Sequence, residues 1–576
     1  MSATAVPAAP RPTIRARSRW LLPEPADASA VETLCRELKL PPLLCRLLVS
    51  RGFADVESAK RYLRPRLEQL HDPSTLGDMD RAVERVVRAI RAGEMILVHG
   101  DYDVDGICST TILTRTLRRL GARVTPFIPH RSDGYDLTAA GVRAARDVRA
   151  KLVITCDCGT SALAPVEELQ SAGVDVIVTD HHLPGGPLPR ALAVLNPRKP
   201  GCTSPDKDLC AAAVAYKLAM GVTQAMAASP NPVYNMIDLV ALATIADVAP
   251  LRGENRVLAR CGLRVLNETK NVGLASLRRA AGLEKKLITS GRVGFILAPR
   301  LNAAGRVGSA LRGVELLLAN EESVANPIAR ELEELNGHRQ ELDRAVLETA
   351  RDMVKTLDLE QTYGIVLAAE GWHPGVIGIV ASRIVEEFGR PTILIALEGN
   401  EGKGSGRSIS PFDLHAGISK CRDLLLRFGG HRSAAGVTVA RDRVADFTRR
   451  FNEVARETLR PEDLVPELRA DLEVELQEVS DHLEELFRYI EPCGIGNPAP
   501  VLVARGVRVA AAPKTVGKDG LRVLLHQNGT QLTAIGWGMG GRASELAVGA
   551  TIDVAFKLDR DDWNGDLQLR LADFRA

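Results

Sequence analysis

The sequence lacks cysteine pairs at the spacings that bind zinc or carry out redox chemistry. None of its ten cysteines forms a Cys-x-x-Cys pair, and Cys156 and Cys158 flank Asp157 too closely for a zinc knuckle. The sequence shows no secretory signal either. We therefore expect reduced, buried thiols in a cytoplasmic protein rather than a framework of disulfides.

Long apolar runs and net charge are also missing. No apolar run approaches the ~18 residues that span a bilayer, so the sequence predicts no membrane partner. The 74 basic residues nearly balance the 72 acidic ones, which leaves a net charge of +2. A nucleic-acid partner would therefore have to be bound by local clefts rather than by a global basic field. The sequence contains no Walker motif and no internal repeat.

The composition is that of a globular protein with sizeable cores, because 45% of residues are hydrophobic and 25% are charged. A length of 576 residues predicts ~4 domains. Residues 1–19 are rich in Ala, Pro and Arg and contain no acidic residue. That composition resembles a transit peptide, but it fits a disordered tail better.

Strand and helix patterns alternate between residues 78 and 250. Strand-forming segments read MILVHG, RVTPFIP, KLVITCD, VDVIVTD and LAVLNP, with helical stretches between them. Such alternation predicts an α/β fold with a parallel sheet that is covered on both faces. The apolar segment 236–251 that follows is typical of a buried helix.

The second half of the chain predicts three further segments. Residues 313–356 are a charged amphipathic stretch, either a helix that connects two lobes or an ordinary pair of surface helices. A second α/β segment begins near Tyr363 and carries GKGSGRS and FGGHRSAAG. Short strands with turn signals follow to the end of the chain and suggest a small OB-type β-barrel. The predicted organisation is a tail and small helical region (1–77), a first α/β domain (78–312), a connecting helix (313–356), a second α/β domain (357–462) and the barrel (463–576).

The segment HGDYDVDG, residues 99–106, begins like an EF-hand calcium loop. An EF-hand takes a bidentate Glu from position twelve, which counted from Asp101 is Ile112, and it needs a preceding helix. Here the preceding residues are strand formers and the following ones have helical spacing. The segment is therefore expected to be an acidic loop between a strand and a helix. In an extended chain Asp101, Asp103 and Asp105 would project to one side, where a bound cation would relieve their repulsion.

Three predicted strands end in metal-binding residue types. The first is followed by the three aspartates, the next by Asp157, and another by Asp180, His181 and His182. The carboxyl ends of parallel strands meet at one edge of a sheet. One such Asp would be an ordinary solvated residue and one such His a core residue, but three clusters together favour a metal site. Oxygen and imidazole ligands suit Mn²⁺ or Mg²⁺. Asp247, in the apolar segment IADVAPL, is expected to be a buried carboxylate that needs a partner, which a metal ion would supply.

The motifs HGDYDVDG, CDCGT, TDHH and IADVAPL resemble the successive motifs of the DHH phosphoesterase superfamily. GSGRS and GGHRSAAG resemble its DHH-associated domain. IEPCGIGNPAP and the C-terminal strands resemble the OB-type domain of the RecJ family, which are single-strand-specific 5′→3′ DNA exonucleases. The resemblance covers roughly residues 78–576, with Asp136 where the family often has Gly and Cys493 in place of an aromatic residue.

The resemblance implies a phosphodiester hydrolase with two divalent ions, Mn²⁺ or Mg²⁺. Asp157 would bridge the ions, Asp103 and His99 would complete one site, and Asp105, His181 and Asp247 the other. His182 would face the scissile phosphate, and Asp101 and Asp180 would orient ligands. Direct roles in catalysis are expected for Asp101, Asp157 and His182.

The same motifs imply a set of substrate contacts: Arg131, Tyr135, Arg306, Ser405, Arg407 and His431. Of these, Arg131, Ser405 and Arg407 are a suitable set for a terminal phosphate, which would place cleavage at the 5′ end. The barrel would bind single-stranded DNA through side chains such as Lys514, Arg522 and Trp537. The implied function is 5′ digestion to mononucleotides in DNA repair and recombination, by a monomer that acts with a single-strand-binding protein and a helicase. The alternative is a phosphodiesterase of short oligonucleotides or cyclic dinucleotides.

Overall fold

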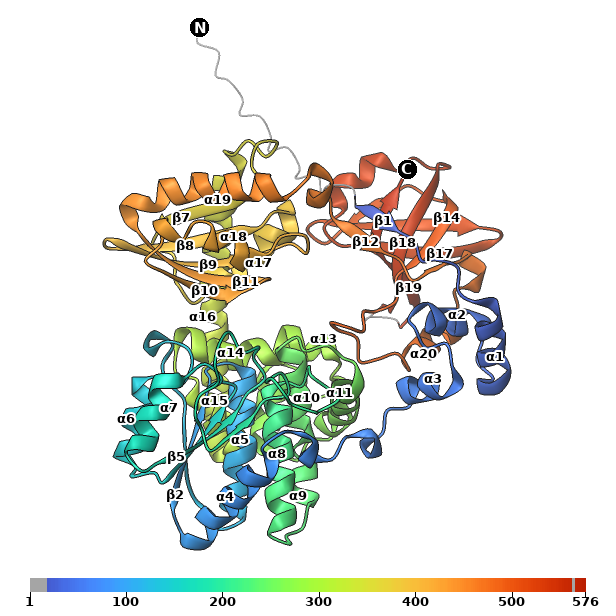
Figure 1. Cartoon of the computed structure of the whole chain (residues 1–576). Helices are drawn as coiled ribbons and strands as arrows, with labels where there is room; N and C mark the ends of the chain where they lie inside the picture. Colours follow the sequence, from blue (N-terminus) through green and yellow to red (C-terminus); the bar gives the residue numbers. More distant parts are fainter. Residues whose placement is uncertain (1–17, 562–564) are drawn as a thin grey trace. The chain divides into compact units, whose positions relative to one another are not determined.

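The computed structural model describes residues 18–561 and 565–576, and these form two compact units (Figure 1). The parallel-sheet unit consists of Leu63–Glu341 and Ile490–Pro498. The barrel-containing unit consists of the described part of Met1–Tyr62 together with Leu342–Tyr489 and Ala499–Ala576. The predicted tail, residues 1–19, lies outside the described residues except for its last two.

The parallel-sheet unit is built on a five-stranded sheet. In chain order the strands are β2 (Met95–Gly100), β3 (Arg123–Phe127), β4 (Leu152–Cys156), β5 (Asp175–Thr179) and β6 (Ala193–Leu195). Their order across the sheet is β3-β2-β4-β5-β6, and every neighbouring pair is parallel. This confirms the predicted α/β class and the predicted strands.

Helices cover both faces of this sheet, as Figure 1 shows. Successive strand residues point to opposite faces. Ile96 and Ile154 therefore pack into the core below α4 (Met79–Ala92), α5 (Val104–Arg119) and α8 (Ala211–Ala225). Leu97 and Val153 pack instead against α6 (Ala139–Asp147) and α7 (Leu163–Ser171). Burial on both faces explains why these strands are continuous apolar runs.

The rest of this unit is helical. The remaining helices are α9 (Asn231–Tyr234), α10 (Ile237–Ala246), α11 (Gly253–Asn267), α12 (Val272–Ala280), α13 (Ser290–Arg292), the π-helical turn Val293–Leu297, α14 (Ala298–Val307) and α15 (Leu311–Leu318). The long helix α16 (Glu322–Lys355) runs from this unit into the other. The predicted buried helix after the sheet is α10.

The barrel-containing unit holds a second α/β layer. Its sheet has the order β10-β11-β9-β8-β7, from β7 (Ile365–Glu370), β8 (Thr392–Glu398), β9 (Glu401–Arg407), β10 (Arg427–His431) and β11 (Ala434–Ala440). Only β7 and β8 run parallel among these described strands. The helices of this layer are α17 (Ile377–Phe388), α18 (Leu414–Ser419) and α19 (Val444–Thr458).

The C-terminal strands form a closed sheet, which confirms the predicted barrel. Its strands are β13 (Leu472–Glu473), β14 (Leu502–Val509), β15 (Lys514–Val516), β16 (Gly520–Gln527), β17 (Thr530–Gly536), β18 (Thr551–Arg560) and β19 (Leu567–Arg575). Pairing of β14 with both β18 and β16 closes the sheet on itself. Asn528 and Gly529, both with positive φ, make the tight turn between β16 and β17.

The N-terminal segment belongs to the same unit as the barrel. It contains β1 (Arg19–Leu21), α1 (Ala28–Leu38), α2 (Pro42–Ser50) and α3 (Val56–Leu63). Strand β1 pairs in parallel with β12 (Glu467–Arg469), and α20 (Asp481–Phe487) lies further along the chain. No helix in the described ranges has both the length and the hydropathy needed to cross a bilayer.

Candidate metal centre

The strand order places a crevice at the carboxyl ends of β2 and β4. The chain continues from β2 to β3 on one side and then returns to β4 on the other, and ligands bind where the strand order reverses in this way. The terminal residues Gly100, Cys156 and Thr179 lie side by side in register. Asp101, Asp157 and Asp180, which follow them directly, are therefore neighbours, as the sequence predicted.

The expectation that Asp101, Asp103 and Asp105 share an extended segment is wrong. Asp103 is the N-cap of α5, and its Oδ1 accepts hydrogen bonds from the amides of Asp105 (2.9 Å) and Gly106 (3.1 Å). Asp105 lies in the first turn of the helix, where its two oxygens accept bonds of 2.7 Å from the amides of Ala211 and Ala212. The first amides of a helix have no partner within the helix and bind nearby carboxylates. Asp103 binds those of α5 and Asp105 binds those of α8, so α5 begins at Val104 and the chain does not stay extended as far as Asp105.

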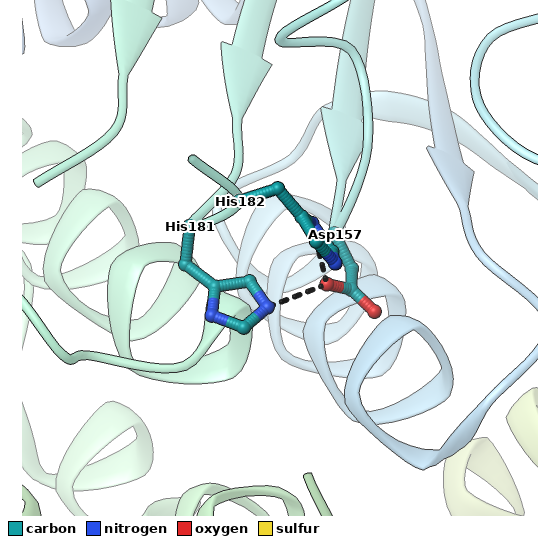
Figure 2. Close-up of side chains that lie close together, drawn as sticks. All are labelled: Asp157, His181 and His182. Atoms are coloured by element: carbon teal, nitrogen blue, oxygen red, sulfur yellow. Dashed lines mark ion pairs between the residues drawn. The ribbon is translucent and has the colours of Figure 1, made fainter. Parts of the chain in front are cut away.

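Three overlapping groups of possible ligands meet at this edge: one, drawn in Figure 2, is Asp157, His181 and His182, and the other two have no residue in common. Asp101, Asp103 and Asp157 form one, and Asp105, His181 and Asp247 form the other; within each group the ligand atoms lie within 4.8 Å of one another. The groups adjoin because Nε2 of His181 lies 3.2 Å from Oδ1 of Asp157 (Figure 2). Asp157 is thus placed between two potential cation sites.

Asp247 differs from expectation in its burial. It follows α10 as the C-cap, and its side chain is 25% exposed rather than buried in the apolar segment. Its Oδ2 lies 3.8 Å from Nε2 of His181. The helix end turns the carboxylate out of the core and toward the other ligands.

The donor set fits divalent cations. Burial and then the charges of neighbouring aspartates raise the pKa of Asp157 and Asp101 well above the usual value, and burial with Asp103 raises the pKa of Asp105 to about 7. Oδ1 of Asp101, Oδ1 of Asp157 and Nε2 of His181 are buried without a hydrogen-bond partner. A cation bound among them would offset the repulsion between the aspartates and give these three atoms a partner. Carboxylate and imidazole ligands without a thiolate suit Mn²⁺ or Mg²⁺.

Asp180 fixes the orientation of the two histidines. Its Oδ1 accepts hydrogen bonds from the amides of His181 (2.7 Å) and His182 (3.2 Å) and from Nδ1 of His182 (2.8 Å). Burial disfavours the charged form of both histidines, and it lowers the pKa of His181 to about 4. In His182 the bond to Asp180 outweighs burial and raises the pKa to about 9. His182 is thus held in its protonated form and His181 in its neutral form.

Tyr135 contacts the same histidine. Its hydroxyl donates to the carbonyl oxygen of Asp157 (3.0 Å) and lies 3.0 Å from Nδ1 and 3.3 Å from Nε2 of His182. The neighbouring Asp136, which departs from the family pattern, has φ of 84°, a value that a glycine would adopt without strain. Its carboxylate accepts from the amides of Leu137 (2.8 Å) and Gly159 (2.6 Å), which compensates for the backbone strain.

His99 lies outside both ligand groups. Its ring is fully buried against Phe127, with 5.5 Å between ring centroids, and Nδ1 lies 3.6 Å from Sγ of Cys158. The close approach of Gly141 to the ring leaves no room for a Cβ atom there. The structure therefore groups Asp101, rather than His99, with Asp103 and Asp157.

Helix α14 carries the predicted contact Arg306 and supports the acidic loop. Gly305 lies so close to Tyr102 that an added Cβ would be 2.0 Å from the Tyr102 carbonyl oxygen. Arg131 donates through Nε to the Gly305 carbonyl (3.0 Å), and its guanidinium lies 4.2 Å from the centroid of the Tyr102 ring. The predicted contacts Arg131 and Arg306 thus belong to one packed arrangement beside the ligands.

Ser405, Arg407 and His431 belong to the barrel-containing unit. In β9, alternate glycines face the apolar residues beneath the sheet, so Lys403, Ser405 and Arg407 share the other face. Arg407 donates to Oγ of Ser405 (3.2 Å), and a Cβ on Gly378, near the start of α17, would lie within 3.0 Å of both side chains. His431 pairs with Ala434, which pairs with Arg407, so these residues occupy one row across the sheet.

The barrel presents two of the predicted strand-binding side chains on one hairpin, and the third, Trp537, follows β17 and packs against that hairpin. Lys514 and Arg522 are directly opposed in β15 and β16. Trp537 is 55% exposed and its ring lies close to Gly517 and Gly520 of the same hairpin. Trp537 is therefore a surface side chain and not part of the barrel core.

Sequence reasoning missed three supporting residues. Nδ2 of Asn196, which follows β6, donates to the carbonyl of His182 (2.8 Å), and Oδ1 of Asn302 accepts from the amide of Val104 (3.2 Å). The third is Cys158, which contacts His99. The same rule, that functional polar residues directly follow strands, applies to the Asn in LAVLNP, so Asn196 could have been predicted from the sequence.

Three family models match the chain. The DHH family N-terminal domain matches residues 95–244, the DHHA1 domain residues 361–457, and the RecJ OB domain residues 470–573. With the acidic centre, these matches define the class: a DHH phosphoesterase with a DHH-associated domain and an OB domain. The five predicted domain bounds and the predicted site residues stay predictions.

The relatives narrow the class. The single-stranded-DNA-specific exonuclease RecJ of Bacillus subtilis is 36% identical over 96% of this chain and 70% of its own length. That of Escherichia coli is 34% identical over 94% of this chain and 96% of its length. The crystal structure of Thermus thermophilus RecJ with Mn²⁺ matches with a TM-score of 0.84 and 33% identity, covering 97% of this chain and 80% of that one. The chain belongs to the RecJ family.

These comparisons confirm the predicted enzyme class and cofactor. RecJ of T. thermophilus has been crystallised with Mn²⁺ and with Mg²⁺. The protein is a metal-dependent hydrolase that uses divalent ions of this kind, and the ligand groups described above are suited to hold them.

Proposed function

We propose that the protein degrades single-stranded DNA from its 5′ end to mononucleotides, in DNA repair and recombination. The observation that carries the proposal is the pair of adjoining ligand groups, which share the position between Asp157 and His181. The relatives named single-stranded-DNA-specific exonuclease RecJ, which match along nearly the whole chain, support the substrate class.

Each ligand residue has a defined task in this proposal. Asp157 would contribute to both cation sites, with Asp101 and Asp103 completing one and Asp105, His181 and Asp247 the other. When bound, the ions supply a nucleophile at neutral pH and stabilise the charge of the phosphodiester.

Protein side chains hold the substrate in place. His182, kept protonated by Asp180, donates a hydrogen bond to a phosphate oxygen and so stabilises the charge that develops there. The Tyr135 hydroxyl also contacts the His182 ring and helps to hold it in position. The buried Asp180 accepts its hydrogen bonds from His181, His182 and the amide of Thr160. It therefore orients the two histidines and does not contact the substrate.

Ser405 and Arg407 supply a terminal phosphate site. Arg407 offers a planar set of donors, Ser405 offers a hydroxyl, and both lie beside the start of α17, where helix amides favour an anion. A site that requires a terminal phosphate selects the 5′ end. This set of residues supports the direction of digestion.

The barrel supplies a second surface that binds the single strand. An exposed Trp537 stacks on bases, and Lys514 and Arg522 contact phosphates. A cytoplasmic monomer that receives strands from a helicase and a single-strand-binding protein fits this arrangement.

The alternative, a phosphodiesterase of short oligonucleotides or cyclic dinucleotides, explains less of the chain. It gives no role to the domain at residues 470–573, which matches the RecJ OB domain. A small substrate also needs no exposed stacking surface beyond the metal centre.

The test compares substrates of different length. Purified protein with Mn²⁺ is given a 5′-phosphorylated 40-nucleotide single strand, a trinucleotide and a cyclic dinucleotide at equal nucleotide concentration. We expect the long strand to have the highest kcat/KM, because only it reaches the barrel. Preference for the cyclic dinucleotide would favour the alternative.

A further inference from the structure

A cavity of about 710 Å³ lies at the C-terminal end of α5, in the parallel-sheet unit. Its volume falls in the range of roughly 300–1,000 Å³ that is usual for small-molecule sites. The candidate metal ligands Asp103 and Asp105 lie at the opposite end of the same helix. Since α5 has 16 residues, the two ends are about 24 Å apart. The cavity is therefore separate from the metal centre.

Positive side chains from two elements line this cavity. Arg115, Arg118 and Arg119 come from the last two turns of α5, and Lys270 comes from the segment after α11. Within the described part of the chain, Arg118, Arg119 and Lys270 form no ion pair or side-chain hydrogen bond. Arginines at the end of a helix interact favourably with its dipole, but this does not account for Lys270 or for a cavity between the cations.

Two carboxylates also line the cavity, and they do not cancel the charge. Both oxygens of Asp238 are already engaged, by the Leu239 amide (2.8 Å) and by the Thr269 hydroxyl (2.7 Å). Glu268 is the other. Four cations and two carboxylates leave a local charge of +2 in a protein whose whole net charge is +2.

The geometry of the cations suits one ligand class. Arg115 is partly buried and fixed, because its Nη2 donates to the carbonyl of Leu317 (2.5 Å). Arg118 and Arg119 are exposed and can turn toward a ligand. Guanidinium groups bind phosphate through paired hydrogen bonds, and a lysine adds a point charge.

We propose that this cavity binds a small phosphate monoester, such as a nucleoside monophosphate, at a site separate from the metal centre. The proposal goes beyond the function proposed above and does not depend on it. Free phosphate and a nucleotide share the same phosphate chemistry, and the experiment distinguishes them.

The experiment is calorimetric titration of the full-length protein in EDTA, which removes metal-dependent binding. The ligands are dAMP, inorganic phosphate and deoxyadenosine. The variant is Arg118→Ala/Arg119→Ala, both exposed, and the matched control is Arg143→Ala/Arg190→Ala, which removes two exposed arginines elsewhere in the same unit. Circular dichroism and thermal melts verify that both variants fold.

We expect dAMP to bind the wild type and the control equally, and the Arg118/Arg119 variant roughly tenfold or more weakly. Deoxyadenosine should bind much more weakly than dAMP. Binding of inorganic phosphate as tight as that of dAMP would support the site and assign it to free phosphate, whereas tighter binding of dAMP would assign it to a nucleotide.

Three results would overturn the proposal. They are no binding of either phosphate ligand to the wild type at millimolar concentration, equal binding by the Arg118/Arg119 variant, or equal binding of deoxyadenosine. Titration of Asp157→Asn adds a check on location. If that variant loses dAMP binding while Arg118→Ala/Arg119→Ala keeps it, the ligand occupies the metal centre and not this cavity.

Discussion

Asp157 is the residue that we propose as the shared ligand of the metal centre. Its position directly after β4 places it between the two ligand groups, and its φ of 66° lies in the left-handed region. For residues other than Gly, Asn and Asp this conformation costs roughly 1–2 kcal/mol. Asp adopts it at little cost, whereas Ala in its place would be strained. A substitution here must therefore keep the backbone geometry to test the chemistry.

Asp157→Asn meets this requirement, since Asn tolerates the left-handed region. We expect Mn²⁺ stoichiometry, measured by calorimetry, to fall below two per chain, and nuclease activity to fall by orders of magnitude. In EDTA the melting temperature should not fall, because one of several mutually repelling carboxylates is removed. The exposed Asp147→Asn on α6 is the control. Near-wild-type activity of Asp157→Asn would refute the bridging role.

Arg407→Ala tests the terminal phosphate site. Each charge-assisted bond contributes about 1.5–3 kcal/mol, so the wild type should digest 5′-phosphorylated strands roughly tenfold or more faster than 5′-hydroxyl strands. The variant should lose this preference while binding Mn²⁺ normally. Lys403→Ala, which removes a cation from the same face of β9, should keep it. Initial rates on the two substrates decide, and a preference retained by Arg407→Ala would place the pocket elsewhere.

At the residue scale, strand ends were predictable from sequence and helix starts were not. Asp101, Asp157 and Asp180 follow apolar runs whose period and length identify strands, so their proximity could be inferred. The capping role of Asp103 and the contact of Asp105 with α8 could not, because the helix start depends on which carboxylate takes the free amides. His99 lies outside the ligand groups and packs closely against Gly141, a long-range contact that sequence patterns do not predict.

At the element scale, α14 determines the shape of the acidic loop. Gly305 permits backbone contact with Tyr102, Asn302 caps the amide of Val104, and Gly305 also accepts a bond from Arg131. The helix begins directly after the π-helical turn, which sets its rotational position. Sequence patterns identify such a helix but not the face that it presents.

Gly305→Ala should disturb the loop. The new Cβ would meet the Tyr102 carbonyl at 2.0 Å, and overpacking of this kind costs about 1–3 kcal/mol. We expect a lower melting temperature and lower nuclease activity. Gly294→Ala, where nothing lies within 4 Å of the added atom, should be neutral or slightly stabilising. Equal effects of both variants on melting and activity would show that α14 does not support the centre through this contact.

At the scale of the whole molecule, each compact unit is assembled from distant segments. The strand β1 near the N-terminus pairs with β12, and Ile490–Pro498 belongs to the parallel-sheet unit. There the carbonyl oxygen of Ile495 accepts a hydrogen bond from the amide of Leu251 (2.7 Å). The carbonyl oxygen of Ile490 accepts one from Nη1 of Arg256 (2.8 Å). Sequence patterns predicted the order of the α/β segments and the barrel. They did not predict that β1 would pair with β12 or that Ile490–Pro498 would join the parallel-sheet unit. Removal of the barrel by truncation would therefore damage both units.

A point substitution tests the barrel more cleanly. Stacking contributes about 1–3 kcal/mol per base, so Trp537→Ala should weaken binding of a 40-nucleotide single strand roughly fivefold to a hundredfold. Cleavage of a trinucleotide should be unaffected. Val548→Ala, also on the surface, is the control. Fluorescence anisotropy in EDTA measures the affinities, and an unchanged affinity would show that Trp537 is not a stacking platform.

The central claim is that the protein is a metal-dependent exonuclease specific for single strands. The most direct measurement is a time course on a 5′-phosphorylated, 3′-labelled strand, alone and annealed as a blunt duplex, in Mn²⁺ and in EDTA. The account predicts progressive shortening of the single strand from its 5′ end in Mn²⁺, little digestion of the duplex, and none in EDTA. Internal fragments without progressive shortening, equal digestion of the duplex, or activity that survives EDTA would contradict it.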